Sequence, residues 1–208
     1  MSDLVRSKST VMVLTIAIAL FVVPGAWADS IATLTMQSQP GDYIGQGQSY
    51  NLTYTGSDIV AQVIQTVAGS PAEIDFILWP TTNPFALLYF GTNQLGTPLQ
   101  VGSYTDAQRA VFAAPGYAGL DVSFDHRGSN TLTGSFEITQ LMFGPGNTIQ
   151  AFQASFIEHS EGLAPALSGT FTYYANPIAV PEPASLTLCG AGLLGMAVAL
   201  RKKLAAQI

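Results

Sequence analysis

The chain has 208 residues, of which 48% are hydrophobic and only 10% are charged. Of its 13 acidic and seven basic residues, 11 acidic but only two basic ones lie in the segment 29–178, which gives that segment a net charge near −9. Such a negative field repels phosphate backbones, so nucleic acid is not expected as a partner, and docking on anionic lipid is disfavoured.

Residues 1–28 are predicted to form a signal peptide. Two basic residues precede an apolar run at 11–23, and Pro-Gly then ends it. Ala26 and Ala28 supply the small side chains that a signal peptidase reads, so we expect cleavage between Ala28 and Asp29. An uncleaved anchor is the alternative, although this 13-residue run, interrupted by Thr15, is short for a membrane span.

The segment 29–178 has the length of one exported domain. Short runs rich in β-branched and aromatic residues alternate with Gly, Pro and Asn about every ten residues, which predicts an all-β fold. We expect a jelly-roll-like β-sandwich, with a partly open barrel as the alternative. The predicted strands are Ile31–Gln37, Ser49–Thr55, Gln62–Val67, Glu73–Leu78, Ala86–Phe90, Ala110–Phe112, Leu120–Phe124, Leu132–Phe143, Thr148–Ile157 and Gly169–Tyr174. No disulfide is expected, because the only cysteine is Cys189.

One hairpin can be specified in more detail. The strands 132–143 and 148–157 flank the turn signal Gly-Pro-Gly-Asn at 144–147. Burying both apolar faces requires paired residue numbers with an even sum, near 290, which places Phe136 opposite Ala154. The segments 125–129 and 158–161 then converge at the open end of the hairpin.

The C-terminal segment 179–208 has three parts. Pro181-Glu182-Pro183 is followed by 17 uncharged residues, 184–200, which is about the shortest length that can cross a membrane as a helix. Arg201-Lys202-Lys203 follows at once, and this basic cluster favours a cytoplasmic C-terminus, with the domain on the far side of the membrane. A plain membrane anchor is the alternative to a processed signal.

This tail resembles the PEP-CTERM sorting signal of Gram-negative bacteria. The resemblance implies that a membrane-embedded thiol protease, an exosortase, cuts near Pro181-Glu182-Pro183. It also implies transient residence of residues 184–200 in the inner membrane, and a final place at the cell surface or outside the cell. Exosortase systems are associated with exopolysaccharide and with the biofilm or floc matrix.

The middle of the chain resembles an uncharacterised secreted bacterial β domain, through the segments 40–47, 102–109, 127–134, 158–162 and 165–167. Relatives of that kind tend to carry cysteine at the positions of Ser129 and Ser160. The resemblance therefore implies a disulfide that this chain lacks, and the hairpin pairing independently places the two serines almost opposite each other.

The convergent polar segments offer weak candidates for chemistry. Asp125, His126, Glu158, His159 and Glu161 could supply metal ligands, but adjacent strand residues point to opposite faces and Arg127 would repel a cation. A solvated loop end is the simpler interpretation. Ser123 or Ser129 beside His126 could suggest a serine hydrolase, but the Gly-x-Ser-x-Gly turn is lacking. Glycoside hydrolysis by Glu73 and Asp75 would need a groove between the carboxyls, which spacing alone does not show. We expect no cofactor, no metal and no catalysis.

A ligand surface is a further hypothesis. Flat aromatic rings beside neutral polar groups hold sugars in many β-sandwiches, because apolar sugar faces stack on rings. The candidates are Trp79, Tyr43, Tyr104, His126, Arg127 and His159, although the same rings could simply plug the ends of the sandwich. The sequence thus predicts a non-enzymatic exported surface or matrix protein associated with exopolysaccharide. A carbohydrate-binding module is the first alternative, and a secreted hydrolase is the second.

Overall fold

The computed structural model describes residues 29–175, and this part of the chain is all β, as predicted. Its strands are β1 (Ile31–Ser38), β2 (Ser49–Thr55), β3 (Ile59–Val67), β4 (Ser70–Leu78), β5 (Ala86–Gly91), β6 (Gly102–Arg109), β7 (Gly119–Phe124), β8 (Leu132–Phe143), β9 (Ile149–Ser160) and β10 (Leu167–Tyr174). Four short 3₁₀ turns join them, η1 (Gly56–Asp58), η2 (Asn93–Leu95), η3 (Ala110–Phe112) and η4 (Pro145–Asn147).

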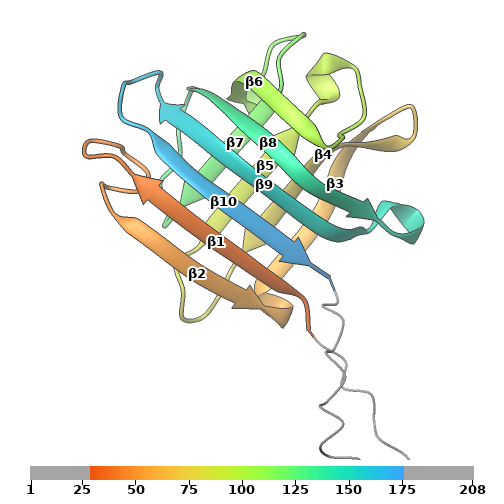
Figure 1. The fold of residues 1–208 in the computed structure, drawn as a ribbon, viewed down its shortest axis with the longest axis horizontal. Coiled ribbons are helices and arrows are strands. Elements are labelled where there is room, and N and C mark those ends of the chain that lie inside the picture. Colours follow the sequence, from red (N-terminus) through yellow and green to blue (C-terminus); the bar gives the residue numbers. More distant parts are fainter. Residues whose placement is uncertain (1–28, 176–208) are drawn as a thin grey trace, which may run out of the picture. The chain divides into compact units, whose positions relative to one another are not determined.

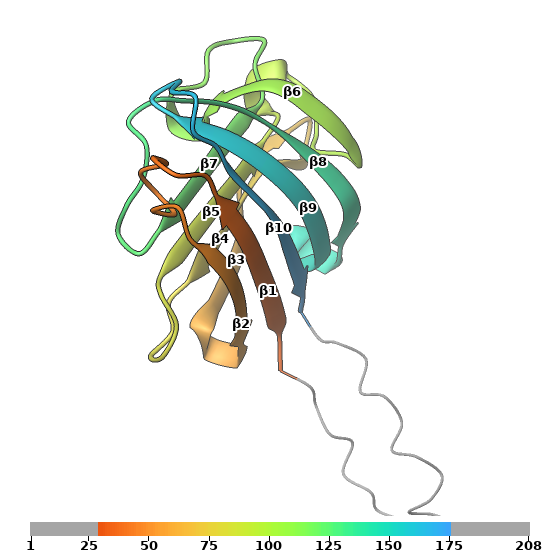
Figure 2. The same ribbon diagram turned by 60° about the vertical axis from the view of Figure 1, so that its left-hand side comes forward.

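All ten strands belong to one sheet, in the order β2-β1-β10-β9-β8-β6-β7-β5-β4-β3. The sheet folds over on itself, so that β2, β1, β10, β9 and β8 face β7, β5, β4 and β3 across the core (Figure 1; Figure 2). The fold is therefore a nearly closed, barrel-like sheet. The predicted sandwich of two separate sheets is wrong, and the alternative of a partly open barrel describes the domain better.

Strand β6 is the reason that the layers form one sheet. It pairs antiparallel with β8 and, over only two residue pairs, parallel with β7. We did not predict it, because Gly102–Arg109 is mostly polar and has Thr105 as its one β-branched residue. The strand predicted at Ala110–Phe112 is instead the 3₁₀ turn η3.

The open side of the barrel lies between the two edge strands, β2 and β3. Here the loop 79–85 is hydrogen-bonded to β2. The Tyr54 hydroxyl donates to the Pro84 carbonyl at 2.9 Å, and the Asn83 side-chain amide donates to the Thr53 carbonyl at 2.7 Å. Burial raises the pKa of Tyr54 to about 12. Hydrogen bonds from a loop thus replace the strand pairing that would close the barrel.

The hairpin of β8 and β9 has the predicted faces but a shifted register. Phe136 lies opposite Phe156, where we expected Ala154, and Leu132 lies opposite Ser160. The turn is centred on Gly146, whose φ of 66° requires the left-handed region, and this centre is one residue later than expected. A one-residue shift of the centre moves each partner by two residues, so the inward faces are preserved.

Aromatic side chains join the two layers. Phe76 of β4 packs against Phe152 and Phe171 at centroid distances of 5.1 and 4.7 Å, and Phe90 of β5 packs against Phe136 at 5.3 Å. All five rings are buried. Burying rings of this size supplies a large apolar contribution to the stability of a domain whose described residues include no cysteine.

The first and last strands are neighbours. Strand β10 lies between β1 and β9, and Ile31 is paired with Tyr174. The two ends of the described chain therefore leave the same end of the sheet (Figure 1). The opposite end carries the loops 39–48 and 161–166, next to the pair Ser38–Leu167. We call this opposite end the distal end.

Candidate functional site

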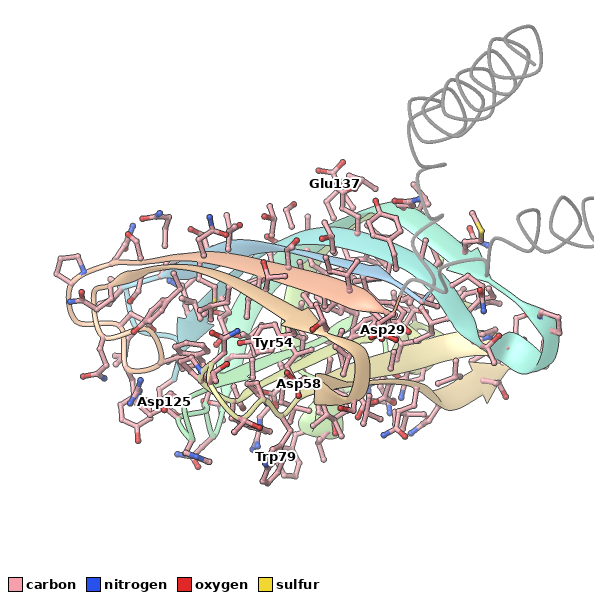
Figure 3. The ribbon with its side chains drawn as sticks, turned by 90° about the horizontal axis from the view of Figure 1, so that it is seen from below. Asp29, Tyr54, Asp58, Trp79, Asp125 and Glu137 are labelled. Atoms are coloured by element: carbon pink, nitrogen blue, oxygen red, sulfur yellow. The ribbon has the colours of Figure 1, made fainter. Side chains whose placement is uncertain are left out.

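Three aromatic rings meet on the outside of the domain, and we call Trp79, Phe85 and His126 the aromatic cluster. Phe85 contacts Trp79 edge-on at 5.2 Å and stacks on His126 at 5.6 Å with an interplanar angle of 4°. Trp79 is 70% exposed and projects outward, whereas Tyr54 lies between the layers (Figure 3). Two of the predicted ligand residues, Trp79 and His126, are thus brought together through a ring that the sequence analysis missed.

A strained turn presents His126. Phe124 and Arg127 exchange backbone hydrogen bonds of 2.8 and 2.9 Å, and the two residues between them, Asp125 and His126, have φ values of 48° and 64°. Two left-handed residues in a two-residue turn define type I′, which glycine and asparagine usually fill. Aspartate and histidine tolerate this region better than most residues, so the cost is modest.

The remaining predicted ligand residues have separate surroundings. The Arg127 guanidinium donates to the Ile44 carbonyl at 2.9 Å and pairs with Asp125 at 3.1 Å, which ties two distal loops together. Tyr104 stacks on Phe136 at 4.7 Å, and its hydroxyl bonds the backbone of Gln100, so it is a packing residue. Tyr43 is 56% exposed.

The predicted convergence of the segments 125–129 and 158–161 is present in part. The Oγ atoms of Ser129 and Ser160 lie 3.0 Å apart, and the exposed Glu161 carboxylate accepts the Asn130 amide at 2.6 Å, which lowers its pKa. His126 stacks on Phe85, whereas His159 bonds the loop that follows β9. Within residues 29–175, no three His, Cys, Asp or Glu side chains are arranged to hold a metal ion.

Glu158 of β9 forms a hydrogen bond with β7 across the two layers of the sheet, and we call this contact the seam. It is fully buried, and its Oε2 accepts the Val122 backbone amide of β7 at 3.1 Å. Beyond Leu120, β6 no longer pairs with β7, so this carboxyl bonds an amide that a neighbouring strand would otherwise bond. Burial raises the pKa of Glu158 well above its ordinary value, and the negative charge of nearby Asp121 raises it further.

Arg109 ties down the other side of this seam. Its Nε donates to Asp121 at 3.0 Å, its Nη1 donates to the Asn130 carbonyl at 3.2 Å, and its guanidinium lies 5.1 Å from the centre of the Phe112 ring. Burial still raises the pKa of Asp121, although the Arg109 charge acts in the opposite direction. The cluster is therefore a structural lock between β6, β7 and the loop 125–131.

The outer face of β4 carries the two carboxyls considered for glycoside hydrolysis. Glu73 and Asp75 alternate with the core residues Ile74 and Phe76, yet they are only 5% and 1% exposed. Burial raises the pKa of both groups, and Gln62 donates to Asp75 at 3.2 Å. Their neighbours on adjacent strands thus shield both carboxyls from solvent.

The serines considered as nucleophiles have other partners. Ser129 donates to Ser160, and Ser123 lies within 3.5 Å of the Asp121 carboxylate. Neither hydroxyl hydrogen-bonds to His126 within the described part of the chain. The serine–histidine pair that nucleophilic catalysis requires is therefore not formed between these residues.

A groove of about 550 Å³ lies on the outer face of β6, β8 and β9, near the distal end. Its lining consists of Thr105, Asp106, Ala107, Gln108, Tyr117, Thr133, Gly134, Ser135, Ile157 and His159. Only His159 belongs to the predicted ligand surface. The other lining residues could not be selected from the sequence, because the groove depends on the unpredicted strand β6 and on the loop that follows it.

The C-terminal motif was compared with known families. Residues 179–203 match the PEP-CTERM protein-sorting motif, which confirms the resemblance found in the tail. Proteins that carry this motif are exported and are sorted to the cell surface by an exosortase, and the motif implies the same route for this chain. Neither a curated protein nor a solved structure matches the chain.

The segments predicted to direct export lie outside residues 29–175. These are Ala26 and Ala28 of the predicted cleavage site, the triplet Pro181-Glu182-Pro183, the predicted span 184–200 and the basic cluster Arg201-Lys202-Lys203. Asp29, the expected first residue of the mature protein, begins the described part (Figure 3). Within that part, no helix has the length and apolar character needed to cross a bilayer.

Proposed function

We propose that this protein is a non-enzymatic component of the cell surface or extracellular matrix, released by an exosortase-type protease and associated with exopolysaccharide. The observation that carries the proposal is the match of residues 179–203 to the sorting motif. The shielded carboxyls of Glu73 and Asp75 and the hydrogen-bonded serines support a non-enzymatic role. An acidic domain without lysine suits partners that interact through neutral polar groups.

Replacing Pro181-Glu182-Pro183 with alanines tests the sorting step. The full-length variant should accumulate in the membrane fraction, because the protease would lose its recognition motif while the apolar segment remains. The wild-type protein should appear in the medium with an intact mass that corresponds to Asp29 through a residue near Pro183. A Pro177→Ala variant, just outside the matched segment, is the control and should be released normally.

Unchanged release of the triple-alanine variant would remove the exosortase from the proposal. A mature mass that retains residues 184–200 would instead indicate a membrane-anchored surface domain. Association with the matrix is measured separately, by the fraction of released protein that co-sediments with exopolysaccharide from the same cells.

A carbohydrate-binding module is the second candidate function, and the aromatic cluster favours it. A ring as exposed as Trp79 offers an apolar platform, and His126 adds polar nitrogen beside it. A Trp79→Ala variant should lose co-sedimentation with exopolysaccharide if this cluster is the platform. Retention of full co-sedimentation would exclude the cluster as the binding surface.

A further inference from the structure

The groove on β6, β8 and β9 has a lining suited to a specific class of ligand. Of its ten lining residues, Asp106 is the only carboxylate, and none is lysine or arginine. Hydroxyl and amide groups are supplied by Thr105, Gln108, Thr133 and Ser135, and apolar surface by Tyr117 and Ile157. Neutral hydrogen-bonding groups beside an aromatic ring match the alternating polar edges and apolar faces of a sugar.

A row of three polar residues crosses the floor of the groove. Gln108, Thr133 and His159 are direct partners on adjacent strands, and they alternate with the inward-facing Ala107, Gly134 and Glu158. All three side chains therefore face outward, with neighbours about 4.8 Å apart. Such a spacing allows successive hydroxyls of one bound chain to be contacted.

The contacts of His159 leave its Nε2 as a hydrogen-bond acceptor for a ligand. Its Nδ1 lies 3.1 Å from both the Leu163 and the Ala164 carbonyl oxygens, which can only accept. Nδ1 must therefore carry the proton, and in the neutral ring Nε2 is left as an acceptor. No group in the described part of the chain bonds Nε2, so a ligand hydroxyl can donate to it.

Gln108 holds the loop that carries Tyr117, the tyrosine in the lining of the groove. Its Oε1 accepts the Ala114 amide at 2.9 Å, and its backbone amide donates to the Ala118 carbonyl at 2.9 Å. These two bonds hold the loop that carries Tyr117, which is 41% exposed. Because Oε1 accepts this bond, the side-chain NH₂ of Gln108 is the group of this lining residue that can donate to a ligand.

A bulge adds a strained residue at the rim. The pairing of β6 with β8 shifts between Tyr104 and Ala107, and Asp106 there has a φ of 55°. Bulges of this kind redirect side chains and are common beside binding sites. The shift places the Thr105 and Asp106 side chains on the lining of the groove.

We infer that this groove binds a segment of uncharged polysaccharide, with its sugar faces on Tyr117 and its hydroxyls on Gln108, Thr133 and His159. The inference rests on the proposed function, and it names the site and the ligand class. Strand addition to β8, in the floor of the groove, is excluded because β8 is paired on both sides, with β6 and β9. The absence of cations from the lining, together with Asp106, disfavours acidic polymers.

Calorimetric titration of the protein purified from the culture medium tests the inference. The probes are cellohexaose, maltohexaose, and the neutral and acidic fractions of exopolysaccharide from the same cells, separated by anion exchange. Tyr117→Ala should weaken binding of a neutral probe about five- to ten-fold. Thr133→Val, which removes only the hydroxyl, should weaken it about three-fold. Tyr43→Ala removes an exposed tyrosine ring outside the groove and should leave binding unchanged.

Each result decides between defined alternatives. Binding of no probe, binding of the acidic fraction alone, or full binding by Tyr117→Ala overturns the inference. Loss of binding in Trp79→Ala but not in Tyr117→Ala assigns the ligand to the aromatic cluster instead. The intact mass of each variant in the medium is measured in parallel, so that correct release without binding rejects the groove while leaving the sorting proposal intact.

Discussion

Glu158 makes the stability of the domain depend on pH. Because its pKa is raised in the folded state, the folded protein keeps this proton at pH values where the unfolded chain, with a pKa near 4.5, has released it. The contribution of Glu158 to the free energy of unfolding is therefore greatest below pH 4.5 and is lost as the pH rises through the folded pKa. Asp121 acts in the same direction, because its pKa is also raised.

Glu158→Gln should remove part of this dependence. The variant retains an oxygen for the Val122 amide but cannot ionise, so at pH 8 it should be more stable than the wild type by about 1 kcal/mol or more. At pH 4 the two proteins should differ little. Urea unfolding at both pH values measures this, with the exposed Glu137→Gln as control. Parallel pH profiles of the variant and the wild type would contradict the assignment.

Ser129 and Ser160 occupy a position where a disulfide could form. Both side chains are buried, and their Oγ atoms are 3.0 Å apart. In a Cys189→Ser background, the double variant Ser129→Cys/Ser160→Cys should oxidise and gain about 3 kcal/mol from closure of the intervening loop. Thermal melts with and without reductant measure the gain. The two single-cysteine variants should show none, and failure of the pair to oxidise would mean that the backbone positions do not permit a bridge.

The accuracy of prediction from the sequence differs sharply from residue to residue. The proximity of Ser129 and Ser160 follows from hairpin pairing, which is local, and it is confirmed. The aromatic cluster was found only in part, because Phe85 and His126 belong to loops that tertiary contacts bring together. Tyr104 looked like a loop residue but stacks in the sheet, because its strand was not recognised.

At the scale of elements, close packing between β10 and its neighbours depends on a glycine. A Cβ added at Gly169 would lie 2.5 Å from the Thr35 carbonyl oxygen and 2.6 Å from Cζ of Phe156. Gly169→Ala should therefore cost about 1–3 kcal/mol, because either β1 or the Phe156 ring must move. Ser155→Ala, on the outer face of β9, is the control and should change stability by less than about 0.5 kcal/mol. Thermal or urea unfolding measures both, and equal stability of the two variants would contradict this packing.

Most strands were predictable because they are rich in β-branched and aromatic residues, which mark strands in a sequence. Strand β6 was not, because Gly102–Arg109 owes its conformation to β8 and β7 rather than to its own composition. In β8 and β9 the parity of the pairing was predictable, since burial of Phe136 fixes the face. The offset was not, because it depends on where the turn places its left-handed residues, Gly146 and Asn147.

At the scale of the whole molecule, strand order carries the largest consequence for stability. Strand β10 pairs along its whole length with both β1 and β9. A chain that stops after Ala166 should therefore lose the attachment of β1 and β2 to the rest of the sheet. We expect no cooperative thermal transition and rapid proteolysis of this truncated chain, whereas a chain that ends at Ala175 should fold. A sharp transition in the shorter chain would show that β10 is dispensable.

This strand order also links folding to translocation. A chain that crosses the membrane from its N-terminus delivers β1 first and β10 last, so the position between β1 and β9 stays vacant until Tyr174 has emerged. Until then β1 and β9 expose unpaired edges, which are prone to aggregation. The segment that fills the gap ends at Tyr174, and the matched sorting motif starts at residue 179. On this route the sorting motif therefore reaches the membrane only after the last strand of the sheet has been delivered.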